Sequence, residues 1–549
     1  MMQNLRHNSF VRFVLILMCT IASTALAWNN NMHSIIGVDD ANIYFVYMKN
    51  IAQGYGFVYS IGGEHVEGFT SLSWTLLGSL FFKISEYPEL LLILFNILII
   101  SFTLFQLTRF TDSLFSSSSF SIQSIVLLCC VYLIPGFIEW TILSIMETGL
   151  WSCLITLLIL HILSIINKES TNKEQYVFSL LLGLLVITRP EAMLWSIFFL
   201  IARYVLLYKN TSSIGFSFNK SIIPLSVFVC TIIGLILWRL SYFGYPLPNT
   251  YYAKVSSDIL SNLKHGIGYI YRFLSANPLC LLSTLAISKI LWDRIFKKHS
   301  NNHYSPALYI LISTIIISFA IPLYSGGDHF AYFRFMQSTL PIFYIVLMMI
   351  LNFYGLTVTK QFAIILCFFA IISSGLIDAL AGKSPLKHEW NIAIEGRSLG
   401  EKLSQFFIDE STLPSQGVLV AGGTAYTYKG KTIDLMGLNN TVMAHADKIK
   451  DKKLLKNHAS FNKKVFYQLQ PDLFWISGGI SDSVDYSLLH IGEFASKAFK
   501  QIDVDDSFKK EYSPCIIQKT GIKHKLHIYA RHSFLNTLDT TLYTVLIVK

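Results

Sequence analysis

The sequence predicts a polytopic α-helical membrane protein that ends in a soluble α/β domain. Of its 549 residues, 53% are hydrophobic and only 14% are charged, and the mean hydropathy is +0.51. These values are typical of a chain with many bilayer spans. After residue 381 the composition shifts to Lys, Asp, Ser and Asn, and short apolar stretches alternate with helix-like ones. We therefore expect a membrane domain over 1–380 and an α/β domain over 381–549.

About eleven segments are candidate transmembrane helices, because about 20 apolar residues cross roughly 30 Å of hydrocarbon. They cover residues 10–28, 88–107, 119–138, 145–166, 176–188, 191–208, 220–241, 277–293, 306–324, 335–355 and 361–380. Basic residues fall in alternate loops between them, namely Arg109, Lys168, Lys209, Arg294 and Lys360. The positive-inside rule then places the N-terminus in the cytoplasm and the C-terminal domain on the outer side of the membrane.

The short apolar segment 69–84 would reverse every later loop if it crossed the membrane, so we expect an interfacial or re-entrant helix within an outer loop over 29–87. The N-terminal segment is best explained as an uncleaved signal anchor, with a signal peptide cleaved after Ala27 as the alternative. Much of the formal net charge of +10 lies in short loops between spans. It therefore predicts orientation in the membrane and no nucleic-acid partner.

Two adjacent acids, Asp39 and Asp40, occupy the outer loop in the stretch GVDDANIYF. A structural explanation is that Asp40 caps a helix that begins near Ala41. A chemical one is that one carboxylate takes the proton of an acceptor hydroxyl, while the other orients the acceptor or holds a divalent cation. The aromatic, glycine and acidic residues that follow, which include Tyr44 and Glu67, predict a compact loop and favour the chemical explanation.

Two further polar segments are expected on the same face. The stretch YPLPNTYYAK carries Asn249, Tyr252 and Lys254, whose side chains suit the phosphate of a lipid or, in the structural alternative, an interfacial belt. The stretch SGGDHFAYFRF carries Asp328, His329 and Arg334, in which Arg334 either binds phosphate or pairs with Asp328.

Three charged residues lie near membrane depth, where charges usually pair or line a cavity. Arg189 and Glu191 are close enough in sequence to pair, whereas Glu147 has no obvious local partner and is a candidate for the wall of a substrate pocket. The stretch GVLVAGG at 417–423 predicts a turn at the end of a strand, because no amphipathic helix follows it as a phosphate-binding loop requires.

The residues also resemble a known family. The stretch DDANIYFVYMKNIAQGYGFVYSIGGEHVEGFTS is similar to the first outer loop of GT-C glycosyltransferases that use lipid-phosphate sugars, in particular the terminal β-(1→2)-arabinofuranosyltransferase branch and LphB-like bacterial proteins. LSIMETG, ITRPEA, YFGYPLPNTYYAK, YSGGDHFAYFRF and IDLMGLNN follow in the same order. The resemblance extends from about residue 35 to at least residue 475.

This resemblance implies an inverting transfer from a polyprenyl-phosphate sugar to a glycan or lipid-glycan acceptor, such as lipopolysaccharide, at the outer face of the membrane. It implies Asp39 and Asp40 as catalytic residues, with Asp39 favoured as the base, and Tyr252, Lys254 and Arg334 as donor-phosphate contacts. The remaining candidates for the substrate pocket are Tyr44, Glu67, Glu147, Asn249, Asp328 and His329. No cofactor is required, and a divalent cation at Asp39 and Asp40 stays open. Asp434, Asn439 and His445 match a motif without an assigned role.

Two other classes compete with a transferase. A transporter or flippase of lipid-linked sugars predicts pseudo-symmetric halves and charges near the bilayer midplane. The sequence has no repeat, and its polar clusters collect on one expected face. A non-catalytic scaffold with a glycan-binding domain is compatible with the composition.

Overall fold

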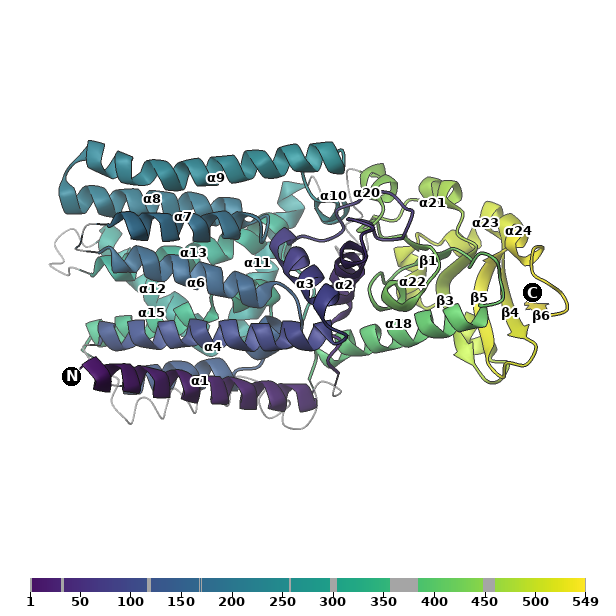
Figure 1. Ribbon diagram of the computed structural model, residues 1–549, viewed down its shortest axis with the longest axis horizontal. Coiled ribbons are helices and arrows are strands. Elements are labelled where there is room, and N and C mark those ends of the chain that lie inside the picture. Colours follow the sequence, from purple (N-terminus) through teal and green to yellow (C-terminus); the bar gives the residue numbers. More distant parts are fainter. Residues whose placement is uncertain are drawn as a thin grey trace.

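In the computed structural model, a bundle of helices is joined end-on to an α/β domain (Figure 1). The structure describes residues 2–30, 34–115, 120–166, 168, 170–255, 258–296, 304–355, 384–447 and 460–548. The N-terminus lies at the end of the bundle that is remote from the α/β domain (Figure 1). The boundary expected at 380/381 lies outside the described residues.

Ten of the eleven expected transmembrane segments coincide with a described helix, and the eleventh, 361–380, lies outside the described residues. The helices are α1 (Met2–Asn30), α4 (Pro88–Leu114), α5 (Ile122–Leu133), α6 (Thr148–Ser164), α7 (Asn172–Val186), α8 (Ala192–Thr211), α9 (Ile214–Tyr242), α12 (Pro278–Phe296), α13 (Pro306–Ser325) and α15 (Leu340–Phe353). A π-helical turn, η1 (Glu139–Leu143), lies between α5 and α6.

Not every apolar helix is long enough to cross a bilayer alone. Among the described residues, five helices meet both the length and the hydropathy that a span needs, namely α1, α4, α8, α9 and α13. A sixth span results if α11 (Ile259–Ala276) and α12, which are bent by 112° at a short break, are counted as one. Shorter apolar helices, such as α5 and α15, fill the interior between the long ones.

Two helices of the predicted outer loop separate the bundle from the α/β domain. Helices α2 (Asp39–Ala52) and α3 (Leu72–Ile84) lie side by side at this boundary (Figure 1). The hydroxyl of Ser71 caps α3 by accepting from the N–H of Trp74. With 13 residues, α3 is too short to span, as expected for 69–84.

Residues 241–276, expected as a loop, also contain helices. Helix α10 (Asn249–Lys254) begins directly after Pro248, and the amphipathic helix α11 packs on α13. The four-residue helix α14 (Arg334–Gln337) precedes α15. Both α10 and α14 end up near α2, which brings three distant parts of the chain to one end of the bundle.

The C-terminal domain is built on a six-stranded sheet in the order β2-β1-β3-β5-β4-β6. Its strands are β1 (Gln416–Val418), β2 (Thr432–Asp434), β3 (Leu473–Ser481), β4 (Tyr512–Lys519), β5 (Lys525–Arg531) and β6 (Tyr543–Ile547). Strand β1 is parallel to β2 and β3, whereas β3, β5, β4 and β6 pair antiparallel. The expected α/β character is therefore confirmed.

Helices surround this sheet and connect it to the bundle. They are α18 (Lys387–Phe406), α19 (Gly423–Thr427), α20 (Thr441–Ala446), α21 (Lys463–Leu469), α22 (Glu493–Ala498), α23 (Asp506–Glu511) and α24 (His532–Leu535), with 3₁₀ turns η3 (Tyr486–Leu489) and η4 (Ile502–Val504). Arg397 on α18 donates to Asn42 on α2 at 2.6 Å and to Glu89 on α4 at 3.1 Å. The turns after β1 and β2 face α2, in the position where open α/β sheets present ligand sites.

Candidate active site

Asp39 and Asp40 are the first two residues of helix α2. The N-cap is Val38, in an extended conformation, so neither carboxylate caps the helix. The structural alternative, in which Asp40 caps the helix, is therefore wrong, although the helix begins close to the position that it assumed. Acids in a first turn are favoured by the unpaired N–H groups and the helix dipole. Successive helical residues point about 100° apart, so the two carboxylates face different parts of the protein.

The Asp39 carboxylate faces the α/β domain. One oxygen accepts the backbone N–H of Gly422 at 3.0 Å and the other accepts the N–H of Gly423 at 2.8 Å. The residue is only 7% exposed. Burial raises the pKa of Asp39 to about 7, helped by the charge of Asp40 and opposed by these two hydrogen bonds. Asp39 is thus poised to exchange a proton near neutral pH.

The glycine turn after β1 is shaped for this contact. A Cβ atom on Gly422 would lie 2.0 Å from the backbone oxygen of Asp39, and one on Gly423 would lie 2.5 Å from the backbone oxygen of Ala393. Only glycine permits this approach. The turn expected from GVLVAGG is present, and a five-residue helix, α19, begins within it. The backbone N–H groups of Gly422 and Gly423 bind the carboxylate of Asp39 in the same chain.

The Asp40 carboxylate faces the cations of the bundle. An oxygen of Asp40 lies 3.5 Å from Nη1 of Arg334, and the side chain is 21% exposed. Burial opposes ionisation, yet the charges of Lys254 and Arg334 hold the pKa of Asp40 below its ordinary value. Burial also lowers the pKa of Lys254, and Asp40 opposes that shift. The structure therefore brings Asp40, Lys254 and Arg334 together, as the sequence predicted.

Arg334 is held on several sides. Its Nε donates to Asp328 at 3.2 Å, so the predicted ion pair is present. Its guanidinium also lies 4.6 Å from the ring centre of Phe330. Tyr332 and Phe333, directly before it, have φ of 59° and 55°. Left-handed non-glycine residues cost free energy and concentrate at functional sites, and here they place α14 against α2.

His329 lies next to this group, on the exposed side. Its ring packs 4.3 Å from that of Phe330. Desolvation is the main cause that lowers the pKa of His329 to about 4; the charge of Asp40 opposes the shift, and those of Arg334 and Lys254 add to it. The ring is therefore neutral at pH 7 and can accept or donate a hydrogen bond there.

Glu389, in the first turn of α18, is a member of this cluster that sequence reasoning missed. Burial and, to a smaller extent, the charges of Asp40 and Asp39 together raise the pKa of Glu389 to about 7. Four carboxylates, those of Asp39, Asp40, Asp328 and Glu389, thus share one region with two cations. The surrounding stretch LKHEWNIAIEG is an ordinary amphipathic helix pattern, and no local signal distinguishes this glutamate.

Tyr252, the third predicted phosphate contact, lies in a stack of rings. Its ring and that of Tyr245 are each 4.1 Å from the ring of His445 on α20. This stack joins α10 to the C-terminal domain. Tyr252 is two residues from Lys254 on the same short helix, a spacing at which helical side chains do not face each other.

The candidate pocket residues Tyr44 and Asn249 make contacts that organise the boundary between the domains. The Tyr44 hydroxyl is 2.7 Å from that of Thr70. The Asn249 side chain donates to the carbonyls of Gly437 at 2.7 Å and Leu438 at 3.0 Å. The structure places both near α2, and their assignment to a substrate pocket stays a prediction.

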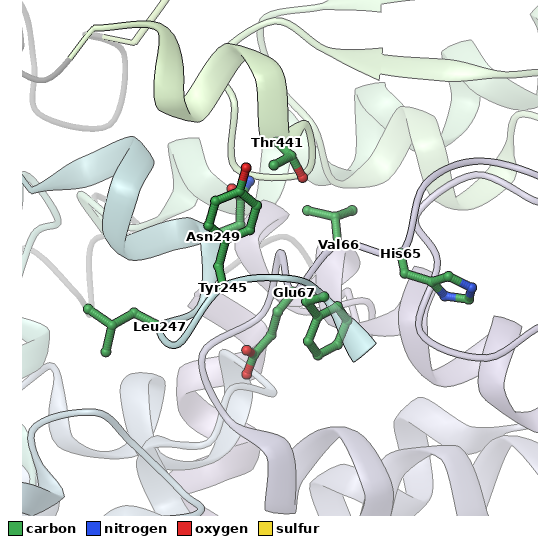
Figure 2. A pocket seen from close by; sticks show the side chains of 8 residues that line it. His65, Val66, Glu67, Tyr245, Leu247, Asn249 and Thr441 are labelled. Atoms are coloured by element: carbon green, nitrogen blue, oxygen red, sulfur yellow. The ribbon is translucent and has the colours of Figure 1, made fainter. Parts of the chain in front are cut away.

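Glu67 forms a buried ion pair with Arg239. Nε and Nη2 of Arg239 donate to its two oxygens at 2.7 and 2.8 Å. Figure 2 shows Glu67 with Asn249 and Thr441 around a small cavity of about 10 Å³. Such a volume holds about one water, so this cavity is too small for a sugar.

Glu147 also has an ionic partner. Arg189 donates to Glu147 and, at 3.0 Å, to Glu191. The expected pair of Arg189 and Glu191 is present, and Glu147, which has no local partner in the sequence, pairs with the same arginine from 42 positions away. Its partner lies on another helix connection and could not be identified from neighbouring residues. One oxygen of Glu147 is buried without a hydrogen bond.

The motif residues of the C-terminal domain support the turn after β2. Asp434 accepts the N–H of Met436 and of Asn439, both at 2.8 Å. The amide oxygen of Asn439 in turn accepts from the Tyr47 hydroxyl at 3.0 Å. Asp434 and Asn439 therefore hold the β2 turn against α2.

The possibility of a divalent cation at Asp39 and Asp40 stays open. Within the ranges that the structure describes, no three His, Cys, Asp or Glu side chains form a group with metal-binding geometry. The carboxylates of Asp39 and Asp40 have hydrogen-bonding and cationic partners instead.

Comparisons with known proteins identify the fold. The sequence matches no protein-family model and no curated protein. Among solved structures, the apo form of ArnT from Cupriavidus metallidurans is similar with a TM-score of 0.52 at 10% identity, covering 95% of this chain and 98% of that one. ArnT bound to undecaprenyl phosphate gives 0.50 at 9% identity, with the same coverage. The apo oligosaccharyltransferase of Archaeoglobus fulgidus gives 0.50 at 12% identity, covering 98% and 76%.

This chain has the fold of GT-C membrane proteins. The expected fold class, a GT-C-like bundle with a C-terminal α/β domain, is therefore confirmed. The arabinofuranosyltransferase branch stays a prediction.

Proposed function

We propose that the chain is an inverting glycosyltransferase, which moves a sugar from a polyprenyl-phosphate donor to a cell-surface glycan at the outer face of a bacterial plasma membrane. Lipopolysaccharide and other envelope polysaccharides are the candidate acceptors. The observation that carries the proposal is the contrast between the two adjacent acids. Asp39 has a pKa of about 7, and Asp40 faces two cations. A similar structure, that of ArnT, contains undecaprenyl phosphate, which supports a lipid-phosphate donor.

The donor phosphate belongs on the bundle side of the pair. Lys254 and Arg334 supply positive charge there, and Arg334 is oriented by Asp328 and Phe330. A partly desolvated cation binds phosphate more strongly than one in water. The family resemblance adds Tyr252, on the same short helix as Lys254, as a further phosphate contact. The polyprenyl tail would then extend between the apolar helices of the bundle.

The acceptor belongs on the side of the α/β domain, which Asp39 faces. Each Asp39 oxygen accepts one backbone N–H, whereas a carboxylate has about four acceptor positions. Positions thus remain for an acceptor hydroxyl. The raised pKa makes Asp39 a stronger base than an ordinary aspartate at neutral pH.

The proposed reaction is a single displacement. The acceptor hydroxyl gives its proton to Asp39 as its oxygen forms a bond with the anomeric carbon. The bond between that carbon and the phosphate oxygen breaks on the opposite face, and its electron pair leaves with the phosphate, which Lys254 and Arg334 stabilise. The products are an inverted glycoside and polyprenyl phosphate, and Asp39 then releases its proton to solvent.

Comparison of surface glycans tests this function. A deletion strain should lack one sugar in mass and linkage analysis, the gene should restore it, and the gene for the Asp39→Asn variant should not. A variant that restores the sugar as fully as the wild type would contradict the catalytic role of Asp39. An unchanged glycan in the deletion strain would contradict the function itself.

Purified protein separates a transferase from a transporter or scaffold. In detergent, with a polyprenyl-phosphate sugar and the glycan of the deletion strain, a transferase releases polyprenyl phosphate and lengthens the glycan. A flippase needs a sealed bilayer and forms neither product, and a scaffold forms neither under any condition.

A further inference from the structure

A cavity of about 300 Å³ lies between helix α2 and the α/β domain. One wall comes from the second half of α2, with Val46, Lys49 and Asn50, and the other from residues 425–432, which follow the glycine turn. Its volume reaches the lower end of the range for small-molecule pockets. It is about thirty times the cavity beside Glu67, so it has room for a sugar.

The cavity carries concentrated positive charge. Lys49, Lys429 and Lys431 all line it. Burial lowers the pKa of Lys49, and the charges of Lys429 and Arg397 lower it further. Among the described residues, none of the three lysines forms an ion pair with a carboxylate, although Arg397 pairs with Glu89. The lysines repel one another, and an anion in the cavity would relieve that repulsion.

Aromatic rings form much of the remaining lining. Tyr59, Tyr426 and Tyr428 line the cavity, and each hydroxyl is bound outside the lysine group: to the carbonyl of Ala421, to Glu89 and to the carbonyl of Pro414. The Lys49 ammonium lies 5.4 Å from the ring centre of Tyr426. An apolar face beside fixed charges suits a sugar that carries a charged group.

The cavity is built from the same two segments, helix α2 and the chain after β1, as the acceptor side of the proposed active site. Lys49 and Asp39 are on the same helix, about 15 Å apart along its axis at roughly 1.5 Å per residue. The segment 425–432 follows directly from Gly422 and Gly423, which bind Asp39. A short oligosaccharide is long enough to span this separation.

We propose that this cavity, with Lys49, Lys429 and Lys431, binds an anionic sugar of the acceptor glycan, at some distance from the hydroxyl that is glycosylated. This proposal rests on the proposed function and adds the chemical class of the acceptor. A sugar carboxylate and a sugar phosphate share the necessary chemistry. The cavity selects acceptors by their charge, whereas Asp39 and Asp40 take part in the sugar transfer.

The test uses the purified full-length chain, a polyprenyl-phosphate sugar and glycan from the deletion strain. The double variant Lys429→Glu/Lys431→Glu should raise the KM for this glycan at least about tenfold, equivalent to about 1.4 kcal/mol, and leave the KM for the donor unchanged. The matched control is Lys509→Glu/Lys510→Glu, which changes two exposed lysines on α23 of the same domain and should leave both constants unchanged.

Modified glycans identify the anionic group. Chemical reduction of its carboxylates, or enzymatic removal of its phosphates, should raise the KM of the wild type by a similar factor, and one of the two treatments should make the wild type and the double variant equal. A wild-type KM in the double variant would overturn the proposal, as would undiminished use of glycan that has lost both groups.

Failure of the proposed function is distinguishable from failure of this site. Binding of fluorescent glycan to the wild type, without donor, is measured in parallel with turnover. Binding that the Lys429→Glu/Lys431→Glu variant loses, without turnover in the wild type, would support the site and contradict the transferase. Turnover with equal binding by both proteins would contradict the site alone.

Discussion

The backbone N–H of Gly423 donates to the carboxylate of Asp39 at 2.8 Å across 384 residues of sequence. With the matching bond from Gly422, it fixes the first turn of α2 against the end of strand β1. The α/β domain therefore helps to orient a carboxylate of the proposed active site, in addition to any role in binding the acceptor.

Gly422→Ala should strongly reduce activity. Its Cβ would lie 2.0 Å from the backbone oxygen of Asp39, so the turn or α2 must move. A displacement of about 1 Å in a reacting group costs on the order of 100-fold in rate, which release of polyprenyl phosphate by purified protein can measure. The control is Gly492→Ala, because Gly492 has a φ of −65° and open space around its Cβ position. Equal activity of the two variants would contradict the positioning role.

The rate should depend on pH through the ionisation of Asp39. A general base acts in its deprotonated form, so kcat/KM should fall about tenfold per pH unit below the Asp39 pKa of about 7 and level off above it. Glu389 titrates in the same range and could produce the same curve. The Glu389→Gln variant separates them, because it should retain the inflection if Asp39 causes it. A profile that is flat from pH 5 to 8 in the wild type would contradict Asp39 as base.

Lys254 should act mainly on the donor. Lys254→Met removes a charge that faces the proposed phosphate position, and truncation of one partner of a buried charge pair costs about 2 kcal/mol or more. The KM for the polyprenyl-phosphate sugar should therefore rise about 30-fold or more, with the KM for the acceptor changed little. Lys264→Met, on the exposed side of α11, is the control. A larger effect on the acceptor than on the donor would place the phosphate elsewhere.

Hydropathy was sufficient to locate most transmembrane helices, because each apolar segment must satisfy its backbone hydrogen bonds internally as a helix. Helix ends differ from the expected ones where a capping residue sets them. Helix α9 begins at Ile214, and not at 220 as the apolar pattern suggested, because the hydroxyl of Ser213 accepts the N–H of Phe216. Helix α11 was missed because Lys264 and Arg272 interrupt its apolar residues, which makes it amphipathic and not continuously apolar.

The candidate site likewise contains residues that the sequence could identify and residues that it could not. Asp39, Asp40 and Arg334 could be proposed from short local patterns and a family resemblance. Glu389 and the Gly422–Gly423 turn could not, because their roles exist only through contacts with residues more than 300 positions away. A single sequence holds no local signal for such pairs. The unexpected partner of Glu147, Arg189, illustrates the same limit within the bundle.

The ion pair of Glu67 with Arg239 should contribute mainly to stability. Both side chains are buried, at 1% and 9% exposure, and they form two hydrogen bonds. Glu67→Gln leaves the Arg239 charge buried without its partner, which typically costs about 3–5 kcal/mol. The melting temperature of the purified protein should therefore fall clearly.

Glu64→Gln is the matched control, because this exposed residue lies in the same loop and accepts a single hydrogen bond, from the N–H of Thr441 at 3.0 Å. Its melting temperature should stay close to that of the wild type. If the Glu67→Gln protein retains the wild-type melting temperature but loses sugar transfer, Glu67 contacts substrate and belongs to the pocket. If stability falls and the KM values of the surviving folded protein are unchanged, Glu67 instead anchors the outer loop to α9. The backbone oxygen of Glu67 accepts the N–H of Asn249, the first residue of α10, so this anchor also positions Lys254 at the end of α10.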